Sequence, residues 1–253
     1  MTARLRNLLA TAATIACVLP ACAAPARCPD LPWPDQPASD PTASKEALRN
    51  APPLFLAIEE QGPSTVKELL ARGERPNACF HGNSLLSIAA LLGYARSVQS
   101  LLDGGADPNS PLDTGGTSAL MHAIDHSHFD IAQTLLAHGA DARRVSDGGL
   151  TSLLALTALV IPPDSPAHAQ QLALGSQLLH AGVCVDSRMT VRGTTALMQS
   201  ALRGDAAMVR LLLDDGADAS LRNAAGISVL DFARKSGKDD VVAMVEAALT
   251  AKP

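Results

Sequence analysis

The sequence predicts an all-α protein built from repeated helix–turn–helix units, and three observations carry this prediction. The chain of 253 residues is rich in Ala and Leu, which favour helix. Aromatic residues, which favour strands, make up only 2% of it. Two independent sequence markers recur at one common interval, and such a period indicates stacked structural repeats.

The first marker is a Leu-Leu-x-x-Gly pattern that occurs five times. It ends at Gly73, Gly105, Gly139, Gly182 and Gly216, and only the step from Gly139 to Gly182 is clearly longer than the others. The second marker is a Leu two positions after a Ser, Thr or Pro, and it occurs at Leu54, Leu86, Leu120, Leu153, Leu197 and Leu230. The shared period predicts a repeat domain over 51–253, with repeats at about 51–82, 83–115, 116–149, 150–193, 194–226 and 227–249.

Each repeat is predicted to hold two short helices. The Ser or Thr before the marker Leu would cap the first helix, whose Leu and small residues face the neighbouring repeat. A glycine, as at Gly93, Gly204 and Gly237, would break the chain before the second helix, which carries the Leu-Leu pair. The glycine of the first marker suits a left-handed helix end, and Asp- and Asn-rich turn chemistry follows it.

The segment Gly105-Ala106-Asp107-Pro108-Asn109 makes the chain resemble the ankyrin-repeat family, whose repeats end in Gly-Ala-Asp-x-Asn. The family's helix start, Thr-Pro-Leu-His-x-Ala, is only partly kept: its Pro survives at Pro53, and its His position holds Phe55, Ser87, Met121, Leu154, Met198 and Asp231. The resemblance covers about 51–249. It implies a curved solenoid whose projecting β-turn fingers and inner helices bind proteins.

The fourth repeat is longer than the others. The surplus lies near 161–168, between the two predicted helices, where Pro-Pro and Ser-Pro indicate that a helix ends. Insertions in repeat proteins map to loops. We therefore expect a loop here, with either no role or a role in binding a partner.

The N-terminal segment, 1–23, has the pattern typical of a secretory signal peptide. Arg4 and Arg6 precede an apolar run from Leu8 to Leu19, and Ala21-Cys22-Ala23 forms a cleavage site that would leave Ala24 first. Leu19-Pro20-Ala21-Cys22 also resembles a bacterial lipobox, in which Cys22 would be acylated. Either alternative exports the protein: the first predicts a periplasmic location, the second a lipid anchor in the envelope and the protein's only contact with a membrane.

The segment 24–50 is a predicted Pro-rich tether, because six prolines between Pro25 and Pro41 prevent a helix or a strand. After cleavage three cysteines remain, Cys28, Cys79 and Cys184, and an exported protein can form disulfides. Cys79 and Cys184 lie three repeats apart, beyond the roughly 7 Å Cα separation that a disulfide allows. The candidate disulfide is therefore Cys28 with Cys79.

The chemistry-bearing motifs are few. His122, His126 and His128 have metal-like spacing, but a metal site needs three or four converging ligands, and a structural role is the preferred interpretation. No Gly-rich phosphate loop, Cys-x-x-Cys pair or Gly-x-Ser-x-Gly motif occurs. The sequence thus predicts a protein that is not an enzyme and that holds no metal and no cofactor; a metal-binding protein remains an alternative.

Net charge and composition limit the classes of partner that the protein is expected to bind. The formal net charge is −5, and loss of the signal, with its two Arg and no acid, lowers it to −7. With few aromatic rings and no basic excess, nucleic-acid binding is not expected. Arginines nevertheless recur in the later predicted fingers and should form one row that suits carboxylates. The candidate partner-binding residues are Arg144, Arg188, Met189, Arg192, Arg222, Leu112 and His81.

The function predicted from these features is a monomeric, non-enzymatic protein-binding module of the bacterial cell envelope. It would act as a scaffold, or as an inhibitor or immunity-type partner, of another exported protein. The alternative is an envelope lipoprotein with a structural role.

The export prediction has a direct test. The mature protein isolated from the native envelope should begin at Ala24, or at an acylated Cys22, because signal removal follows the A-x-A site or the lipobox. Intact-mass measurement distinguishes the two products. Cytoplasmic protein that keeps Met1 would contradict both.

Overall fold

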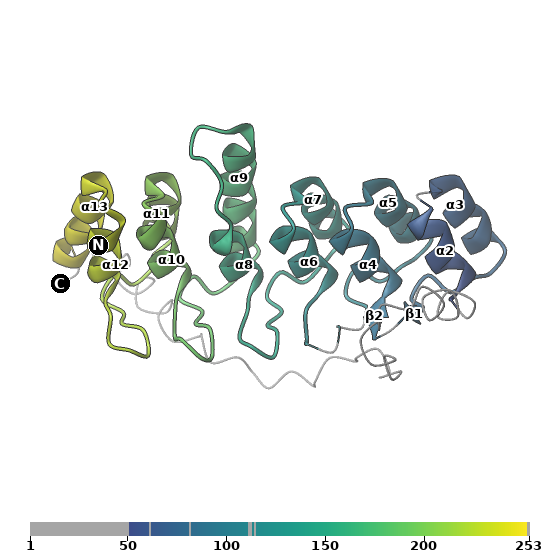
Figure 1. The fold of residues 1–253 in the computed structure, drawn as a ribbon, viewed down its shortest axis with the longest axis horizontal. Coiled ribbons are helices and arrows are strands. Elements are labelled where there is room, and N and C mark those ends of the chain that lie inside the picture. The colour runs from purple at the N-terminus through teal and green to yellow at the C-terminus, as the bar shows by residue number, and fades with distance from the viewer. Residues whose placement is uncertain (1–50, 61, 81, 111–112, 114, 252–253) are drawn as a thin grey trace, which may run out of the picture.

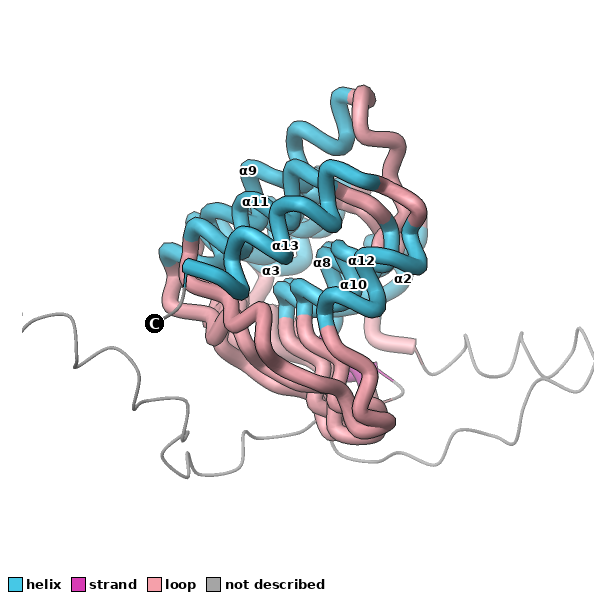
Figure 2. Tube along the Cα trace, turned by 90° about the vertical axis from the view of Figure 1, so that its left-hand side faces the viewer, coloured by secondary structure: helices cyan, strands magenta, loops and turns pink. Residues whose placement is uncertain are grey.

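The computed structural model describes residues 51–60, 62–80, 82–110, 113 and 115–251, and the predicted signal peptide and tether lie outside this part of the chain. The described residues form twelve α-helices arranged as six successive pairs along one row (Figure 1). Viewed along the row, the helices form two layers, and the loops that join successive pairs project together on one side (Figure 2). The all-α repeat architecture predicted from the sequence is confirmed.

One layer holds the first helix of each pair, called the inner helices here. They are α2 (Pro53–Glu59), α4 (Leu85–Leu91), α6 (Ala119–Asp125), α8 (Ser152–Ala158), α10 (Ala196–Arg203) and α12 (Val229–Ser236). The other layer holds the outer helices α3 (Pro63–Ala71), α5 (Ala95–Asp103), α7 (Phe129–Ala137), α9 (Pro166–His180), α11 (Ala206–Asp214) and α13 (Asp239–Ala251). A two-stranded antiparallel ladder, β1 (Cys79–Phe80) with β2 (Asn83–Ser84), joins the first two pairs.

The inner helices begin where the sequence predicts, because a hydroxyl caps five of them. The side chain in each case accepts a hydrogen bond from the backbone N–H three residues on, which satisfies a donor that the first turn leaves unpaired. The caps are Ser84, Ser118, Thr151, Thr195 and Ser228. Gly204 and Gly237 end α10 and α12 in the left-handed conformation, as expected for the break before the second helix.

The core follows the two markers and runs through the whole row. The marker Leu of the first five repeats is fully buried, whereas Leu230 of the last repeat is half-buried. The first Leu of each Leu-Leu pair is fully buried from Leu101 onward, whereas Leu69 of the first repeat is half-buried. A repeat buries its apolar side chains against its neighbours, so each end of the row has one face without a neighbouring repeat.

Contacts between repeats are tight at the turns inside the second and fifth helix pairs. Gly93 has φ +78°, and a Cβ placed there would lie 2.6 Å from the ring of His128 in the next repeat. His128 therefore packs over a glycine of the preceding repeat. Gly204 repeats the arrangement with Lys238, whose Cγ would lie 2.5 Å from a Cβ at position 204.

The surplus of the fourth repeat forms helix as well as loop, which corrects the expectation of a loop. Ser165 caps α9 and Pro166 is its first residue, so this Ser-Pro pair begins a helix instead of ending one. With 15 residues α9 is the longest helix described, and its N-terminal part rises above the neighbouring outer helices (Figure 1). The loop part covers 159–165.

Two side chains hold the inserted segment against the fold. Arg203 at the end of α10 donates to the backbone oxygens of Thr157 and Ala158, which the end of α8 leaves without helical partners. Gln171 of α9 donates from Nε2 to the Leu156 oxygen at 2.8 Å.

Among the described helices, none has the length and apolar character that crossing a bilayer requires.

The Gly93–His128 contact predicts an unequal cost for two glycine substitutions. Gly93→Ala should destabilise the domain by about 2–4 kcal/mol, since left-handed backbone costs a non-glycine residue roughly 1–2 kcal/mol and the clash with the imidazole adds overpacking. Gly139→Ala is the matched control, because Gly139 has φ +87° but open space around it, and should cost only the backbone part. Urea unfolding measures both; equal losses would show that His128 does not pack as described.

A second prediction concerns the nearest-neighbour character of the core. Leu212 in α11 is fully buried, so Leu212→Ala should cost about 2–5 kcal/mol, and Leu212→Asp more because it buries a charge. Because repeats contact only their neighbours, the lost stability should appear first as faster amide hydrogen exchange in α10 to α13. Leu202→Asp, on an exposed position of α10, is the control and should be nearly neutral.

Candidate functional site

The segments that project between successive helix pairs, called fingers here, bring together most of the sequence-predicted site. Each finger leaves its outer helix at the glycine of the first marker, with φ between +84° and +96°, a conformation that glycine adopts without strain. The fingers lie side by side in the view along the row (Figure 2). The fingers are 73–84, 105–118, 139–151, 182–195 and 216–228.

A ladder of side chains joins the bases of successive fingers. The Asp107 N–H donates to Asn77 Oδ1 at 2.8 Å, and the Asp141 N–H donates to Asn109 Oδ1 at 2.7 Å. In the later part of the row the Asp218 N–H donates to Asp186 Oδ1 at 3.0 Å. These bonds tie the base of each of these fingers to the base of the finger before it.

Arg143 occupies the corresponding place between the third and fourth repeats. A guanidinium has no acceptor, so it cannot extend this ladder. Its side chain instead pairs with its own Asp141 at 3.1 Å. The side-chain ladder therefore changes at the step that leads into the long fourth repeat.

Backbone hydrogen bonds fix the register of the finger tips. The Asp147 N–H donates to the Gly115 oxygen, the Thr190 N–H to the Gly148 oxygen, and the Ala224 N–H to the Arg192 oxygen, at 3.0–3.2 Å. Each bond joins one finger to the next. The tips therefore form a row whose side chains have fixed neighbours.

Arg188, Arg192 and Arg222 are exposed in this row. Arg188 and Arg222 hold the same position in successive fingers, one residue before the N–H that closes each finger on Thr194 and Ile227. Arg188 Nη1 lies 3.4 Å from the Arg222 oxygen, and Arg222 Nη1 donates to the Gly226 oxygen at 2.8 Å. We call these three residues the arginine ridge.

Arg144 does not share this position. Val145 and Arg222 form equivalent bridges, to the helix caps Thr151 and Ser228, so Val145 stands where Arg188 and Arg222 stand in their fingers. Arg144 comes one residue earlier; it is half-buried and donates from Nη2 to the Asn109 oxygen at 2.9 Å. The row of four arginines expected from the sequence is a row of three, and Arg144 joins two fingers instead.

The remaining predicted binding residues have different places. Met189 is half-buried beside the ridge, with its Sδ 3.8 Å from Gln199 Nε2. Leu112 and His81 lie outside the described residues. Sequence reasoning missed Val191, which is 85% exposed at the finger tip, and Ile227, which is 40% exposed. An apolar residue beside Arg192 and Gly193 in a turn, with no helix or strand to bury it, was the available signal.

The three histidines with metal-like spacing make different contacts. His122 Nε2 lies 3.1 Å from Asp113 Oδ2, and both side chains are largely buried. Burial lowers the pKa of His122, although Asp113 opposes this shift. His126 stacks on His128 with ring centroids 6.3 Å apart. Over the described ranges no three His, Cys, Asp or Glu side chains are grouped to hold a metal ion.

Both cysteines of the described chain form disulfides. Cys79 is in β1, and Cys184 follows α9. Neighbouring helices pack about 8–10 Å apart, so positions three repeats apart are too distant for these two to bond to each other. Cys28, the predicted partner of Cys79, lies outside the described residues, as do Cys17 and Cys22, and the pairing with Cys28 stays a prediction. That Cys184 is bonded was not foreseen from the sequence.

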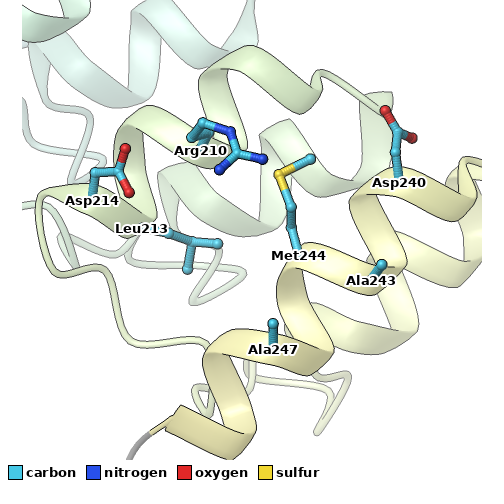
Figure 3. Close-up of a pocket in the computed structure, with 7 residues that line it drawn as sticks. All are labelled: Arg210, Leu213, Asp214, Asp240, Ala243, Met244 and Ala247. Atoms are coloured by element: carbon cyan, nitrogen blue, oxygen red, sulfur yellow. The ribbon is translucent and has the colours of Figure 1, made fainter.

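The outer helices carry shallow grooves between neighbours. One of about 490 Å³ lies between α11 and α13. In Figure 3 the Arg210 side chain extends from α11 toward Met244, while Ala243 and Ala247 present small side chains one turn apart on α13. Leu213 and the carboxylates of Asp214 and Asp240 complete its lining.

Comparison with known protein families agrees with this geometry. The family description "Ankyrin repeats (3 copies)" matches residues 48–146, and "Ankyrin repeat" matches residues 192–224. The segment between the two matches contains the enlarged fourth repeat.

Individual relatives show the same likeness. The chain is 27% identical to the ankyrin repeat protein YahD of Escherichia coli over 80% of this chain and 98% of that protein. It is 39% identical to human ankyrin repeat and MYND domain-containing protein 1 over 30% of this chain, but spans only 9% of that protein's length.

A solved structure extends the comparison to the fold. The crystal structure of an ankyrin repeat domain from Acinetobacter baumannii AYE matches with a TM-score of 0.67 and 25% identity, covering 78% of this chain and 97% of that one. The repeat period, the capped inner helices, the stacked fingers and these matches have one common explanation: the chain belongs to the ankyrin-repeat family.

Proposed function

We propose that this protein is a non-enzymatic binding module of the bacterial cell envelope, which holds another exported protein through its arginine ridge. Ankyrin repeats generally mediate protein–protein interaction. Within that general role, the partner would be a protein with an acidic surface, and the module would act as its scaffold or as its inhibitor, in the manner of an immunity protein.

The observation that carries the proposal is the fixed, exposed row of Arg188, Arg192 and Arg222. None of the three forms an ion pair with a carboxylate among the described residues, so their guanidinium groups keep donors for a partner. Backbone hydrogen bonds between the fingers hold the row in register before any partner arrives. A preorganised surface loses little conformational entropy on binding, which favours affinity.

The exposed aliphatic side chains beside the ridge add apolar contact. Val191 stands next to Arg192 at the same tip, and Ile227 follows in the next finger. Protein interfaces commonly combine apolar contacts with arginines that make bidentate hydrogen bonds to carboxylates. The combination fits a folded protein surface better than a small ligand.

The envelope location rests on the sequence of the segment 1–23, which has the charge, apolar run and small-residue site of a signal peptide. The disulfides of Cys79 and Cys184 are compatible with it, because disulfides persist in oxidising compartments outside the cytoplasm. Capture from the envelope fraction, followed by mass spectrometry, would identify the partner.

The ridge predicts a charge-dependent association. Arg188→Glu with Arg192→Glu should slow association with the captured partner about tenfold or more, because opposite charges steer encounter. The effect should shrink with added salt, as the screening length falls from about 10 Å at 0.1 M to about 3 Å at 1 M. Stopped-flow or surface-based association rates across a salt series measure both.

The matched control is Arg72→Glu with Arg96→Glu, the same charge change at exposed positions by the outer helices. It should leave association nearly unchanged, and neither double variant should unfold the domain, because exposed charges contribute little to stability. Slow association of the outer-helix variant together with normal association of the finger variant would place the contact on the other side and refute the ridge.

A further inference from the structure

We propose that the inserted part of the fourth repeat forms a receptor for one basic side chain, a lysine or arginine, on the surface of a protein partner. The receptor is a hollow of about 580 Å³ beside the N-terminal end of α9, called the notch here. It is separate from the arginine ridge, and it rests on the proposed function only in taking the occupant to be a protein.

The insertion itself builds the notch. Pro163, Asp164 and Ser165, together with His168, Ala169 and Leu172 of α9, form one wall. The opposite wall comes from the turns of the next two repeats: Gly204, Asp205, Ala206, Ala207, Lys238 and Asp240. Because the other repeats lack the extra residues, only α9 rises high enough to make such a wall in the described row (Figure 1).

A buried pair holds the two walls together. His168 Nε2 lies 3.0 Å from Asp205 Oδ2, with the two side chains 4% and 18% exposed. Asp205 also caps α11 by accepting from the Met208 N–H at 3.0 Å. Gln171 anchors the same face of α9 to the end of α8. Side-chain contacts of α9 with α8 and with the next repeat therefore hold the helical part of the notch in place, while Asp164 comes from the loop that precedes α9.

The charges of the lining select a cation. Three carboxylates line the notch, against the single ammonium of Lys238; Asp205 is already bonded to His168 and the Met208 N–H, which leaves Asp164 and Asp240 for a ligand. Asp164 and Asp240 form no ion pair with another described residue, and both are exposed. Asp240 Oδ1 accepts a hydrogen bond from the Val241 N–H at 2.9 Å, and a guanidinium or ammonium entering between the two carboxylates would add charge-assisted hydrogen bonds.

The apolar part of the lining suits the stem of such a residue. The lining also includes the carbon surface of Pro163, Ala169, Leu172 and Ala206. Long basic side chains bury their methylene stems on apolar surface while their charged ends remain among polar groups. The carbon surface and the carboxylates together match the two-part character of lysine and arginine.

A titration with a small probe tests the notch without knowledge of the partner. The blocked peptide acetyl-Gly-Arg-Gly-amide is added to isotope-labelled protein, and acetyl-Gly-citrulline-Gly-amide, its uncharged counterpart, is the control ligand. The arginine peptide should shift the amide signals of Ala169, Gly204 and Ala207 in a saturable way, with a Kd on the order of 1 mM. The citrulline peptide should not.

Three variants sharpen the result. Asp164→Asn with Asp240→Asn should abolish the saturable shifts. Asp239→Asn is the matched control: it removes one carboxylate from the same first turn of α13 but lines neither groove, and should leave binding unchanged. Lys238→Met keeps the stem over Gly204 and removes the competing ammonium, so it should tighten binding several-fold. Thermal midpoints should match the wild type for all three.

The proposal is wrong if the arginine peptide gives no saturable shift at the notch up to about 10 mM, where a site of this affinity is mostly filled. It is also wrong if the citrulline peptide gives equal shifts, or if the Asp239 variant loses peptide binding as fully as the Asp164 and Asp240 double variant. Because the probe binds the isolated protein, such a failure says nothing against the ridge. Conversely, loss of the ridge effect in the partner experiment would leave the notch result standing.

Discussion

A single repeat cannot bury its own apolar face, and this requirement for neighbours governs the whole molecule. The repeated leucines are fully buried inside the row, whereas Leu69 in the first repeat and Leu230 in the last remain half-buried. Stability is then a sum of contacts between neighbours. Small residues and glycines at the contacts, such as Gly93 under His128, let the helices approach closely enough for that sum to be favourable.

The same stacking fixes the positions of the fingers relative to one another. A long loop would ordinarily be mobile, but from the third finger onward each one bonds to the finger before it through backbone groups at the tip. A hydrogen bond to a side chain at the base also joins neighbouring fingers at three of the four steps. Side chains on neighbouring fingers thus acquire fixed spacing, although the strands of the first finger are only two residues long. The surface that meets a partner is a product of the row and not of any one repeat.

The enlarged fourth repeat shows what a departure from the period can do. Its extra residues do not disturb the core, because Arg203 and Gln171 satisfy carbonyl groups at the end of α8. The added length instead raises α9 above the row and creates a wall that no regular repeat has. An insertion is tolerated where its backbone hydrogen bonds are satisfied, and it then adds a surface at little cost to the fold.

The architecture could be predicted from the sequence, because the Leu spacing, the hydroxyl caps and the glycine breaks act within a repeat or between adjacent repeats. The row of finger arginines was predicted as well, except for Arg144: hydrogen bonds between fingers set a register that turns this side chain toward Asn109. The notch was equally hidden: His168 and Asp205 lie 37 residues apart and meet only when α9 packs beside α11. The sequence period determines where the helices and turns lie, because those signals act locally. Which side chains meet across repeats depends on how the repeats pack, and the period carries no information on that.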